Sequence, residues 1–422
     1  MQPETPTAPL RASWAAFTAA PHRMFFWSGA LYTVVAMVVW TQHQIALHTG
    51  WPTPPMWSAP FPLAHGFMML YAAFDFYIFA FLLTTFPRWL NRDPVPRGLY
   101  IPSWALLTAG AHLFWVGLYT AGWLALVGVL LVGAGHALAL LACLRVFLAA
   151  RGEDRLQQVY MLVGLAAGLA GILLTAWELL TNAQWPWLIA REVGLYLFLL
   201  QVIFAVVYRM VPFFTTMVTP GMELRRSRWG LHLWCLALYG RAWLAVAGGY
   251  HFSPMYGWPL DLLLLLVLAN ELRTWRFWQA NMPHLLRILY LALGWFAVSF
   301  AISAGEGLWM WVRGADMRPF GNAALHTLTV GGFGSLLLGI STRVSLGHSG
   351  RGLATGSLVN ILFLGFQAVP VARVLPELVG FWWLPLASKG YWAGLGWVLV
   401  FGVWLLYVAP VLLRPRSDGR PG

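Results

Sequence analysis

The sequence contains few charged residues, which make up only 9% of its 422 positions. Soluble globular proteins have roughly a quarter charged residues, so most of this chain is not expected to face water. Acids are scarcer than bases, with 14 Asp and Glu against 26 Lys and Arg, and the formal net charge is +12. The basic residues are dispersed over many short segments, which favours a role in membrane topology and does not predict a nucleic-acid partner.

Cysteine is almost absent, and the two cysteines, Cys143 and Cys235, lie within apolar segments. Their positions form no disulfide or metal-ligand spacing. Residues 1–23 lack the apolar core of a signal peptide, and we expect them to form a short cytoplasmic tail. The chain also lacks internal repeats, low-complexity segments and any stretch typical of a soluble domain.

Long apolar runs are what the sequence has instead. Sixty per cent of the residues are hydrophobic, and the mean hydropathy is +0.69. Runs of about 18 residues or more, the length needed to cross a bilayer, recur throughout. We therefore predict an all-α, polytopic transmembrane helix bundle of about twelve spans, with an integral domain over 24–412 and a cytoplasmic tail over 413–422. The expected spans begin near Met24, Phe61, Leu99, Gly122, Gln157, Trp187, Trp229, Gly257, His284, Phe320, Gly352 and Lys389.

The distribution of the basic residues predicts the orientation. An even number of spans places both termini on one side of the membrane, and all but six basic residues fall on or near that side. The six on the other side are Arg191, Arg241, Arg313, Arg318, Arg373 and Lys389. Because cytoplasmic loops carry the excess of Lys and Arg, both termini are predicted to be cytoplasmic.

In this orientation several histidines fall in the outer half of the bundle. His65 and His326 lie in the second and tenth spans, each roughly 6–9 Å below the outer interface at about 1.5 Å per residue. His112 falls in the outer half of the third span and His136 near the middle of the fourth. Neutral imidazole binds haem iron and copper well, and two histidines from different helices can hold a haem between them. The alternative for each is a hydrogen bond between helices.

Acids within or next to the spans allow two interpretations. These acids are Asp75, Glu178, Glu192, Glu271 and Glu306. Buried carboxylates are costly and often functional, so they can form a proton path to the outer histidines. The alternative is structural pairing with Arg191 or Arg241.

On the cytoplasmic side, His22 and His348 stand beside Arg23 and Arg351. These arginines can pair with haem propionates or lipid phosphates, or form a solvated rim.

The stretch "LHTLTVGGFGSLLLGISTRVSLGHSGR" carries small residues at every fourth position, namely Thr327, Gly331, Ser335 and Gly339. They share one helical face, and such a stripe lets another helix approach closely in lipid. The same stretch closely resembles the signature of the NnrS family, H-x-L-T-x-G…T-R-x-x-L-G-H-x-G-R. "PHRMFFWSGAL", "FLLTTFPRWLNRDPVPRG" and "YRMVPFFTTMVTPG" resemble other stretches of that family in the same chain order.

The resemblance implies a twelve-span bacterial inner-membrane protein that contains haem, expected to be b-type, and copper. It also implies a role with nitric oxide in nitrosative stress or denitrification. His65, His326, His348, Arg343 and Arg351 match family positions and are the candidate cofactor-binding residues; the candidate metal ligands are His65, His326, His112 and His136. The family commonly has W-H-x-H-E-M where this chain reads "PLAHGFM", so Leu63 and Gly66 replace a possible copper ligand and an acid.

Three functions are consistent with these features. The first is binding or processing of nitric oxide by a haem. The second is a nitric oxide reductase-like enzyme that takes electrons from quinol or a partner, since the chain has no C-x-x-C-H motif and no flavin or nicotinamide fingerprint. Haem-copper oxidases also use twelve spans with histidines in the second and tenth, although the sixth span here has no histidine. The third is a proton-coupled secondary transporter that uses the buried acids.

Overall fold

The computed structural model describes residues 13–52, 59–151, 154–223, 225–248, 254–315, 317–380 and 390–419. These ranges are 82% helical and contain no strand, which confirms the all-α prediction. Helices satisfy their own backbone hydrogen bonds, as an apolar chain must in lipid. The parts of the predicted tails at 1–12 and 420–422, and the predicted start of the last span at Lys389, lie outside the described residues.

The α-helices are, in chain order, α1 (Trp14–Phe17), α2 (Pro21–Thr49), α3 (Phe61–Phe67), α4 (Phe74–Trp89), α5 (Arg97–Tyr119), α6 (Gly122–Ala149), α7 (Leu156–Thr181), α8 (Trp185–Glu192), α9 (Gln201–Val218), α10 (Gly230–Gly248), α11 (Trp258–Thr274), α12 (His284–Arg313), α13 (Ala323–His326), α14 (Gly334–His348), α15 (Ser357–Phe366), α16 (Ala368–Val379) and α17 (Tyr391–Leu413). Three π-helical segments connect some of them without a break: η1 (Met68–Ala73), η2 (Val193–Leu200) and η6 (Thr327–Phe333). Short 3-10 turns are η4 (Pro254–Tyr256) and η5 (Phe277–Gln279).

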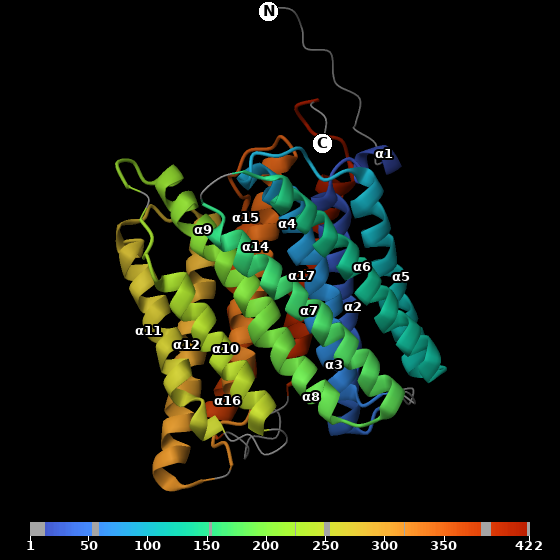
Figure 1. Ribbon diagram of the computed structural model, residues 1–422, viewed down its shortest axis with the longest axis vertical. Coiled ribbons are helices and arrows are strands. Elements are labelled where there is room, and N and C mark those ends of the chain that lie inside the picture. Colours follow the sequence, from blue (N-terminus) through green and yellow to red (C-terminus); the bar gives the residue numbers. More distant parts are fainter. Residues whose placement is uncertain are drawn as a thin grey trace, which may run out of the picture.

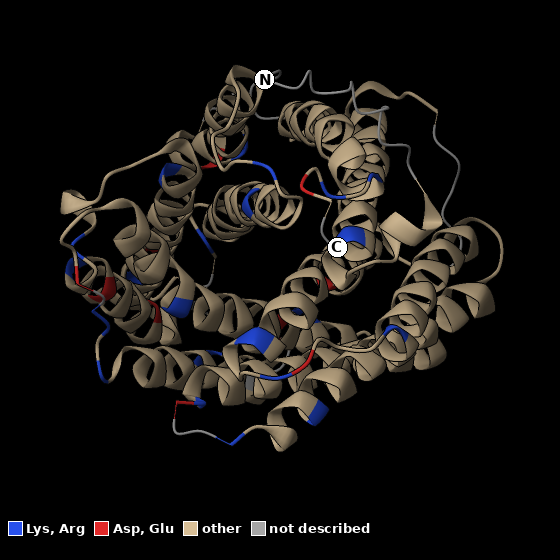
Figure 2. Ribbon diagram, turned by 90° about the horizontal axis from the view of Figure 1, so that it is seen from above, with Lys and Arg blue, Asp and Glu red and all other residues tan. Residues whose placement is uncertain are grey.

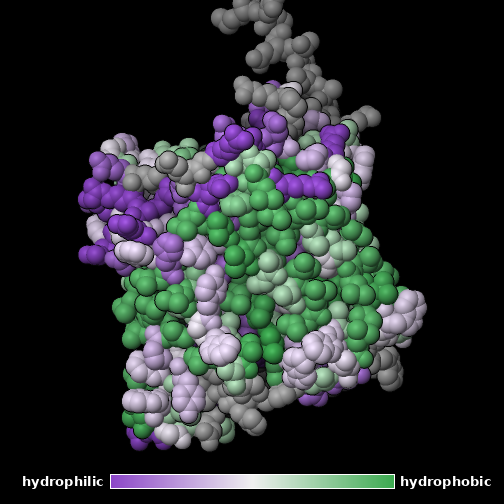
Figure 3. All heavy atoms as spheres, viewed as in Figure 1, coloured by the Kyte–Doolittle hydropathy of each residue, from purple (hydrophilic) through white to green (hydrophobic). Residues whose placement is uncertain are grey.

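Ten helical segments of the described chain are long and apolar enough to cross a membrane. The shorter helices α10 and α11 run beside them, at the positions expected for the seventh and eighth spans (Figure 1). All twelve begin within five residues of the predicted starts. Apolar residues dominate the middle of the visible face, and hydrophilic residues gather at the upper end (Figure 3). The count of twelve crossings stays a prediction.

The two ends of the described chain meet at one end of the bundle. The amide of Ser13 donates to the carbonyl of Leu413 at 3.3 Å, and the guanidinium of Arg23 donates to the carbonyl of Leu412 at 3.0 Å. Figure 2 views this end, where basic positions are spread over several loops and helix ends. We call it the terminal end; its cytoplasmic side stays a prediction.

The small-residue stripe of the tenth span packs against α12, as its spacing predicts. A Cβ on Gly331 would lie 2.7 Å from the Trp295 ring, and one on Gly339 would lie 2.7 Å from Ile288. Ser335 instead faces Gln367, at the junction of α15 and α16, and its hydroxyl accepts a hydrogen bond from the side-chain amide of Gln367 at 3.2 Å. Close packing on this side fixes the rotation of the tenth span and therefore the direction in which His326 points.

Candidate functional site

His65 at the end of α3 and His326 at the end of α13 line one cavity at the end of the bundle opposite the terminal end. The cavity has a volume of about 360 Å³, within the roughly 300–1000 Å³ of ordinary small-molecule pockets. The sequence placed these histidines at similar depth on separate helices, and the fold brings both to the same space. We call it the histidine cavity.

His326 is oriented in the manner of a metal ligand. Its Nδ1 lies 3.0 Å from the carbonyl oxygen of Asn322, one turn earlier. A backbone carbonyl at Nδ1 selects the tautomer that keeps the proton there, which leaves the lone pair on Nε2. The ring can therefore offer Nε2 to a metal in the cavity.

His65 is held by a different contact. Its ring stacks on the indole of Trp40, with centroids 4.2 Å apart. Nδ1 of His65 is buried and has no hydrogen-bond partner among the described residues. A buried polar atom without a partner costs about 1–3 kcal/mol. Stacking on Trp40 therefore holds the plane of a ring that belongs to the cavity lining.

Each of the three π-helical segments contributes to the wall of the histidine cavity. The lining includes Met69 from η1, Leu195 and Leu199 from η2, and Thr329 and Val330 from η6. η1 and η6 also begin within three residues of His65 and His326. π-Helical turns are rare and occur frequently at functional sites, since they re-aim side chains within a continuous helix. No sequence pattern used above could have predicted them.

Two arginines reach the histidine cavity. Arg373 from α16 forms an ion pair with Glu377 at 2.6 Å, and Arg191 from α8 pairs with Glu192 at 2.7 Å. Both residues are part of the cavity lining. Arginine pairs well with carboxylates, including the propionates of a haem. The two imidazoles and two guanidinium groups therefore form a donor set that fits a haem.

The positions that depart from the family pattern are filled by packing. A Cβ on Gly66 would lie 2.5 Å from the ring of Trp187, so the indole occupies the space of a larger side chain. Leu63 is buried in the apolar core. No group of three or more His, Cys, Asp and Glu residues suited to a metal ion occurs within the described ranges. This donor set does not fit a separate copper centre.

His112 and His136 do not line the histidine cavity. His136 is fully buried in α6, where Nδ1 lies 2.8 Å from the Asp75 carboxylate and Nε2 lies 2.8 Å from the carbonyl of Leu165. Nδ1 of His112 in α5 lies 2.8 Å from the carbonyl of Thr108 and also contacts the hydroxyl of Tyr32. Both side chains make hydrogen bonds between helices, which were the alternative to metal ligation. His112 also bonds within its own helix.

His348, Arg343 and Arg351 lie toward the terminal end, away from His326. His348 is the last residue of α14, 22 positions after His326, which corresponds to about 33 Å along a helix. The guanidinium of Arg343 lies over the ring of Phe214 at 3.8 Å from its centroid. These three residues therefore cannot contact a ligand that is held by His65 and His326. The structure divides the five candidate cofactor-binding residues into two groups.

The predicted acids have local partners. The Glu178 carboxylate accepts from the amide of Gln184 at 3.1 Å, and Glu306 accepts from the amide of Phe320 at 3.0 Å. Glu271 accepts from the amide of Ser227 at 3.4 Å. Asp75 pairs with His136. Of the five acids, only Glu192 pairs with one of the two arginines expected, Arg191.

One buried ion pair was missed by the sequence reasoning, which named Arg241 but not its partner. Nε of Arg241 in α10 lies 3.1 Å from the carboxylate of Asp261 in α11. The hydroxyls of Tyr196 and Ser303 bond to Arg241 and Asp261 at 3.0 Å and 2.6 Å. The signal was present as an acid inside the apolar run "WPLDLLLLL". These residues line a polar cavity that shares Arg191 with the histidine cavity.

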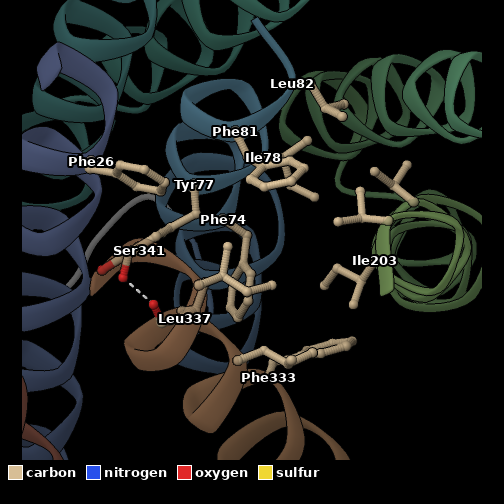
Figure 4. A pocket seen from close by; sticks show the side chains of 14 residues that line it. Phe26, Phe74, Tyr77, Ile78, Phe81, Leu82, Ile203, Phe333, Leu337 and Ser341 are labelled. Carbon is tan, nitrogen blue, oxygen red and sulfur yellow. Dashed lines mark hydrogen bonds between the residues drawn. The ribbon is translucent and has the colours of Figure 1, made fainter. Parts of the chain in front are cut away.

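A small apolar cavity of about 50 Å³ adjoins the histidine cavity, and Phe74 and Phe333 line both. Figure 4 shows side chains from α4, α9 and the tenth span converging on it, among them Ile78 and Ile203. The only labelled hydroxyls nearby belong to Tyr77 and Ser341, and Ser341 donates to the carbonyl of Leu337. The space is suited to a small uncharged molecule and not to an ion.

Comparisons with known proteins identify the family and a similar fold. A family model described as "NnrS protein" matches residues 16–416, nearly the whole chain. A solved structure of a haem-copper terminal oxidase dimer is similar in fold, with a TM-score of 0.66 and 11% sequence identity. That similarity covers 95% of this chain and 86% of the oxidase chain. A search of curated proteins found no match.

Proposed function

Because the chain belongs to the NnrS family, we propose that it is a haem-binding protein of the bacterial inner membrane that binds or processes nitric oxide. The proposed setting is the response to nitrosative stress or denitrification. One observation carries the proposal: His65 and His326, from separate helices, line a single cavity.

The chain's own residues have distinct parts in this proposal. His65 and His326 would bind the haem iron, and the carbonyl of Asn322 holds the His326 ring in the required tautomer. Arg191 and Arg373 would pair with the haem carboxylates. The haem is proposed to be b-type, since the two cysteines are buried in α6 and α10 and form no attachment motif. When bound, the haem supplies an iron that can take nitric oxide as a ligand.

The apolar cavity supports a small uncharged ligand. Nitric oxide carries no charge, so it loses little hydration on entering a space lined by aromatic and aliphatic side chains. Phe74 and Phe333 separate this space from the histidine cavity and help to exclude water from it. Copper is not part of the proposal, because the described residues offer no three-ligand centre.

A nitric oxide reductase-like enzyme is the second candidate, favoured by the fold shared with a haem-copper terminal oxidase. Reduction of nitric oxide requires electrons, for which quinol or a partner protein is the proposed donor. Consumption of nitric oxide by purified protein with a quinol, measured with an electrode, distinguishes catalysis from binding. Transport gains no support, because the acids invoked for it bond to local groups.

The test is the optical spectrum of the purified full chain in detergent, before and after dithionite and nitric oxide. We expect a Soret band that shifts with nitric oxide and is lost in His65→Ala and in His326→Ala. His43→Ala is the matched control, because His43 stacks on Phe61 and does not line the cavity.

Each variant must elute as a single species and retain its circular dichroism, so that loss of the band is separated from loss of fold. Wild-type protein that shows no Soret band even after refolding with added haem contradicts the proposal. An unchanged band in both cavity variants contradicts it as well. A Soret band that does not respond to nitric oxide supports haem binding but contradicts nitric oxide as the ligand of that haem.

A further inference from the structure

A second cavity, at the terminal end, has a strongly basic lining. It has a volume of about 330 Å³, is open to solvent, and lies between the starts of α2 and α5 and the ends of α4 and α14. Its polar lining residues are Thr84, Arg88, Arg92, Arg97, Tyr100 and His348. None of the residues that line it is acidic. We call it the basic cavity.

Two helix N-termini open onto the basic cavity. α2 begins at Pro21 and α5 begins at Arg97, and both residues are part of the lining. Neither helix has a side-chain cap or an acid in its first turn. The first amide groups of a helix lack partners within it, and the helix dipole adds partial positive charge there. Both ends therefore favour an anion in the same space as the arginines.

The wall behind the lining adds one more imidazole and one more guanidinium group. The ring of His22 packs on that of His348, with centroids 4.9 Å apart. His22 is 1% exposed, and its Nδ1 has no hydrogen-bond partner within the described chain. Arg416 donates to the carbonyl of His348 at 3.0 Å.

Two acids near these charges do not line the cavity, namely Asp93, next to Arg92 in the chain, and Asp418. Asp418 is engaged by Arg416 at 2.6 Å. Arg88, Arg23 and Arg416 are all close enough to act electrostatically on His348. These arginines would repel a metal ion bound between the imidazoles of His22 and His348. They favour an occupant with more than one negative charge.

We propose that the basic cavity binds a phosphate group, presented by an anionic phospholipid headgroup or by a soluble phosphate compound. The planar guanidinium fork matches phosphate oxygens in pairs, which suits Arg88, Arg92 and Arg97. A monoanion such as nitrite or nitrate would leave most of this charge without compensation. The site is distinct from the histidine cavity, since His348 and His326 occupy opposite ends of the tenth span.

Three stretches that resemble family signatures meet at this cavity. "PHRMFFWSGAL" provides Pro21, and "FLLTTFPRWLNRDPVPRG" provides Arg88 and Arg97. The stretch "LHTLTVGGFGSLLLGISTRVSLGHSGR" provides His348. Their convergence explains why the sequence carries His and Arg together at these places without any contact to the haem ligands.

The experiment compares wild type with the double variant Arg88→Gln/Arg97→Gln, and with Arg88→Gln alone in case the double variant does not fold. The matched control is Arg273→Gln/Arg287→Gln, two arginines near the adjoining ends of α11 and α12 that do not line the cavity. Calorimetry of delipidated protein in neutral detergent uses inorganic pyrophosphate as the probe. Mass spectrometry measures phosphatidylglycerol retained through purification.

We expect wild type and the control to bind pyrophosphate, to retain phosphatidylglycerol, or both. The cavity variant should lose about tenfold or more of this binding, and the loss should shrink at high salt. Retained lipid that pyrophosphate displaces identifies the headgroup as the source, and pyrophosphate binding without retained lipid identifies a soluble phosphate. Equal binding in wild type and variant, no binding of either probe, or equal competition by nitrate overturns the proposal. A normal Soret band in the cavity variant shows that loss of phosphate binding is independent of haem binding at the histidine cavity.

Discussion

The imidazole of His65 lies against the indole of Trp40, with centroids 4.2 Å apart and an interplanar angle of 17°. This stacking fixes the ring plane of a side chain whose Nδ1 has no hydrogen-bond partner in the described chain. Trp40 comes from α2, so a residue of the first span orients the proposed ligand of the second. Ring orientation in this site is therefore a property of the assembled bundle.

Replacing Trp40 should weaken haem binding without removing either histidine. In Trp40→Leu the His65 ring loses an aromatic contact worth about 0.5–1.5 kcal/mol, and we expect faster haem loss by roughly tenfold or less. The measurement is transfer of haem to apomyoglobin, followed at the Soret band. Trp123→Leu is the control, because that indole is 65% exposed and does not line the cavity. Equal rates in both variants would show that stacking has no part in haem retention.

Neutralising Arg373 should loosen the haem carboxylates. Loss of one charge-assisted hydrogen bond costs about 1.5–3 kcal/mol, so Arg373→Gln should release haem about ten- to a hundredfold faster. The spectrum of the bound haem should keep its position, because both histidines remain. Arg313→Gln at the end of α12 lies outside the cavity lining and should release haem at the wild-type rate.

His136 should prove structural. In His136→Ala the buried Asp75 carboxyl group loses its 2.8 Å partner, and we expect about 1–3 kcal/mol of destabilisation, because a buried polar group is left without a hydrogen bond. Thermal unfolding in detergent should show a lower midpoint, while the Soret band per mole of folded protein stays unchanged. A lost Soret band with normal stability would instead assign His136 to the metal.

The Arg241–Asp261 pair should show strong coupling. Removing one partner from a buried ion pair costs about 3–5 kcal/mol, because the other charge is left buried. Arg241→Gln and Asp261→Asn should each lower the unfolding midpoint, and the double variant should be more stable than the sum of the two losses predicts. Additive losses would indicate that the two side chains act independently.

Gly331 should tolerate no side chain. A Cβ there would lie 2.7 Å from the Trp295 ring, and overpacking of this kind costs about 1–3 kcal/mol. Gly331→Ala should therefore lower the unfolding midpoint and, by shifting η6, broaden or shift the Soret band. Gly402→Ala in α17 is the control, because no atom lies within 4 Å of its added Cβ.

The fold was largely predictable because its determinants are local. Apolar runs long enough to cross a bilayer must form helices in lipid, and Pro, Gly and charged residues mark their ends. The twelve observed helical segments therefore begin close to the predicted starts. The small-residue stripe likewise specified a close helix contact, although only the structure identified α12 as the partner.

The candidate site was only partly predictable. Depth along a helix follows from counting residues, and this placed His65 and His326 at one level. The same counting could not distinguish them from His112 and His136, because the direction of a side chain depends on which neighbours its helix meets. In the structure, Asp75 and the carbonyl of Leu165 engage His136, whereas open space adjoins His326.

The sequence by itself determined a helical membrane protein, the level of each histidine and the family to which the chain is similar, since periodicity, length and local motifs are written along the chain. Tertiary structure alone decided which side chains share a cavity, because the rotation and packing of each helix result from contacts among distant segments. For that reason, residues of one signature motif lie at opposite ends of the tenth span, in the histidine cavity and the basic cavity.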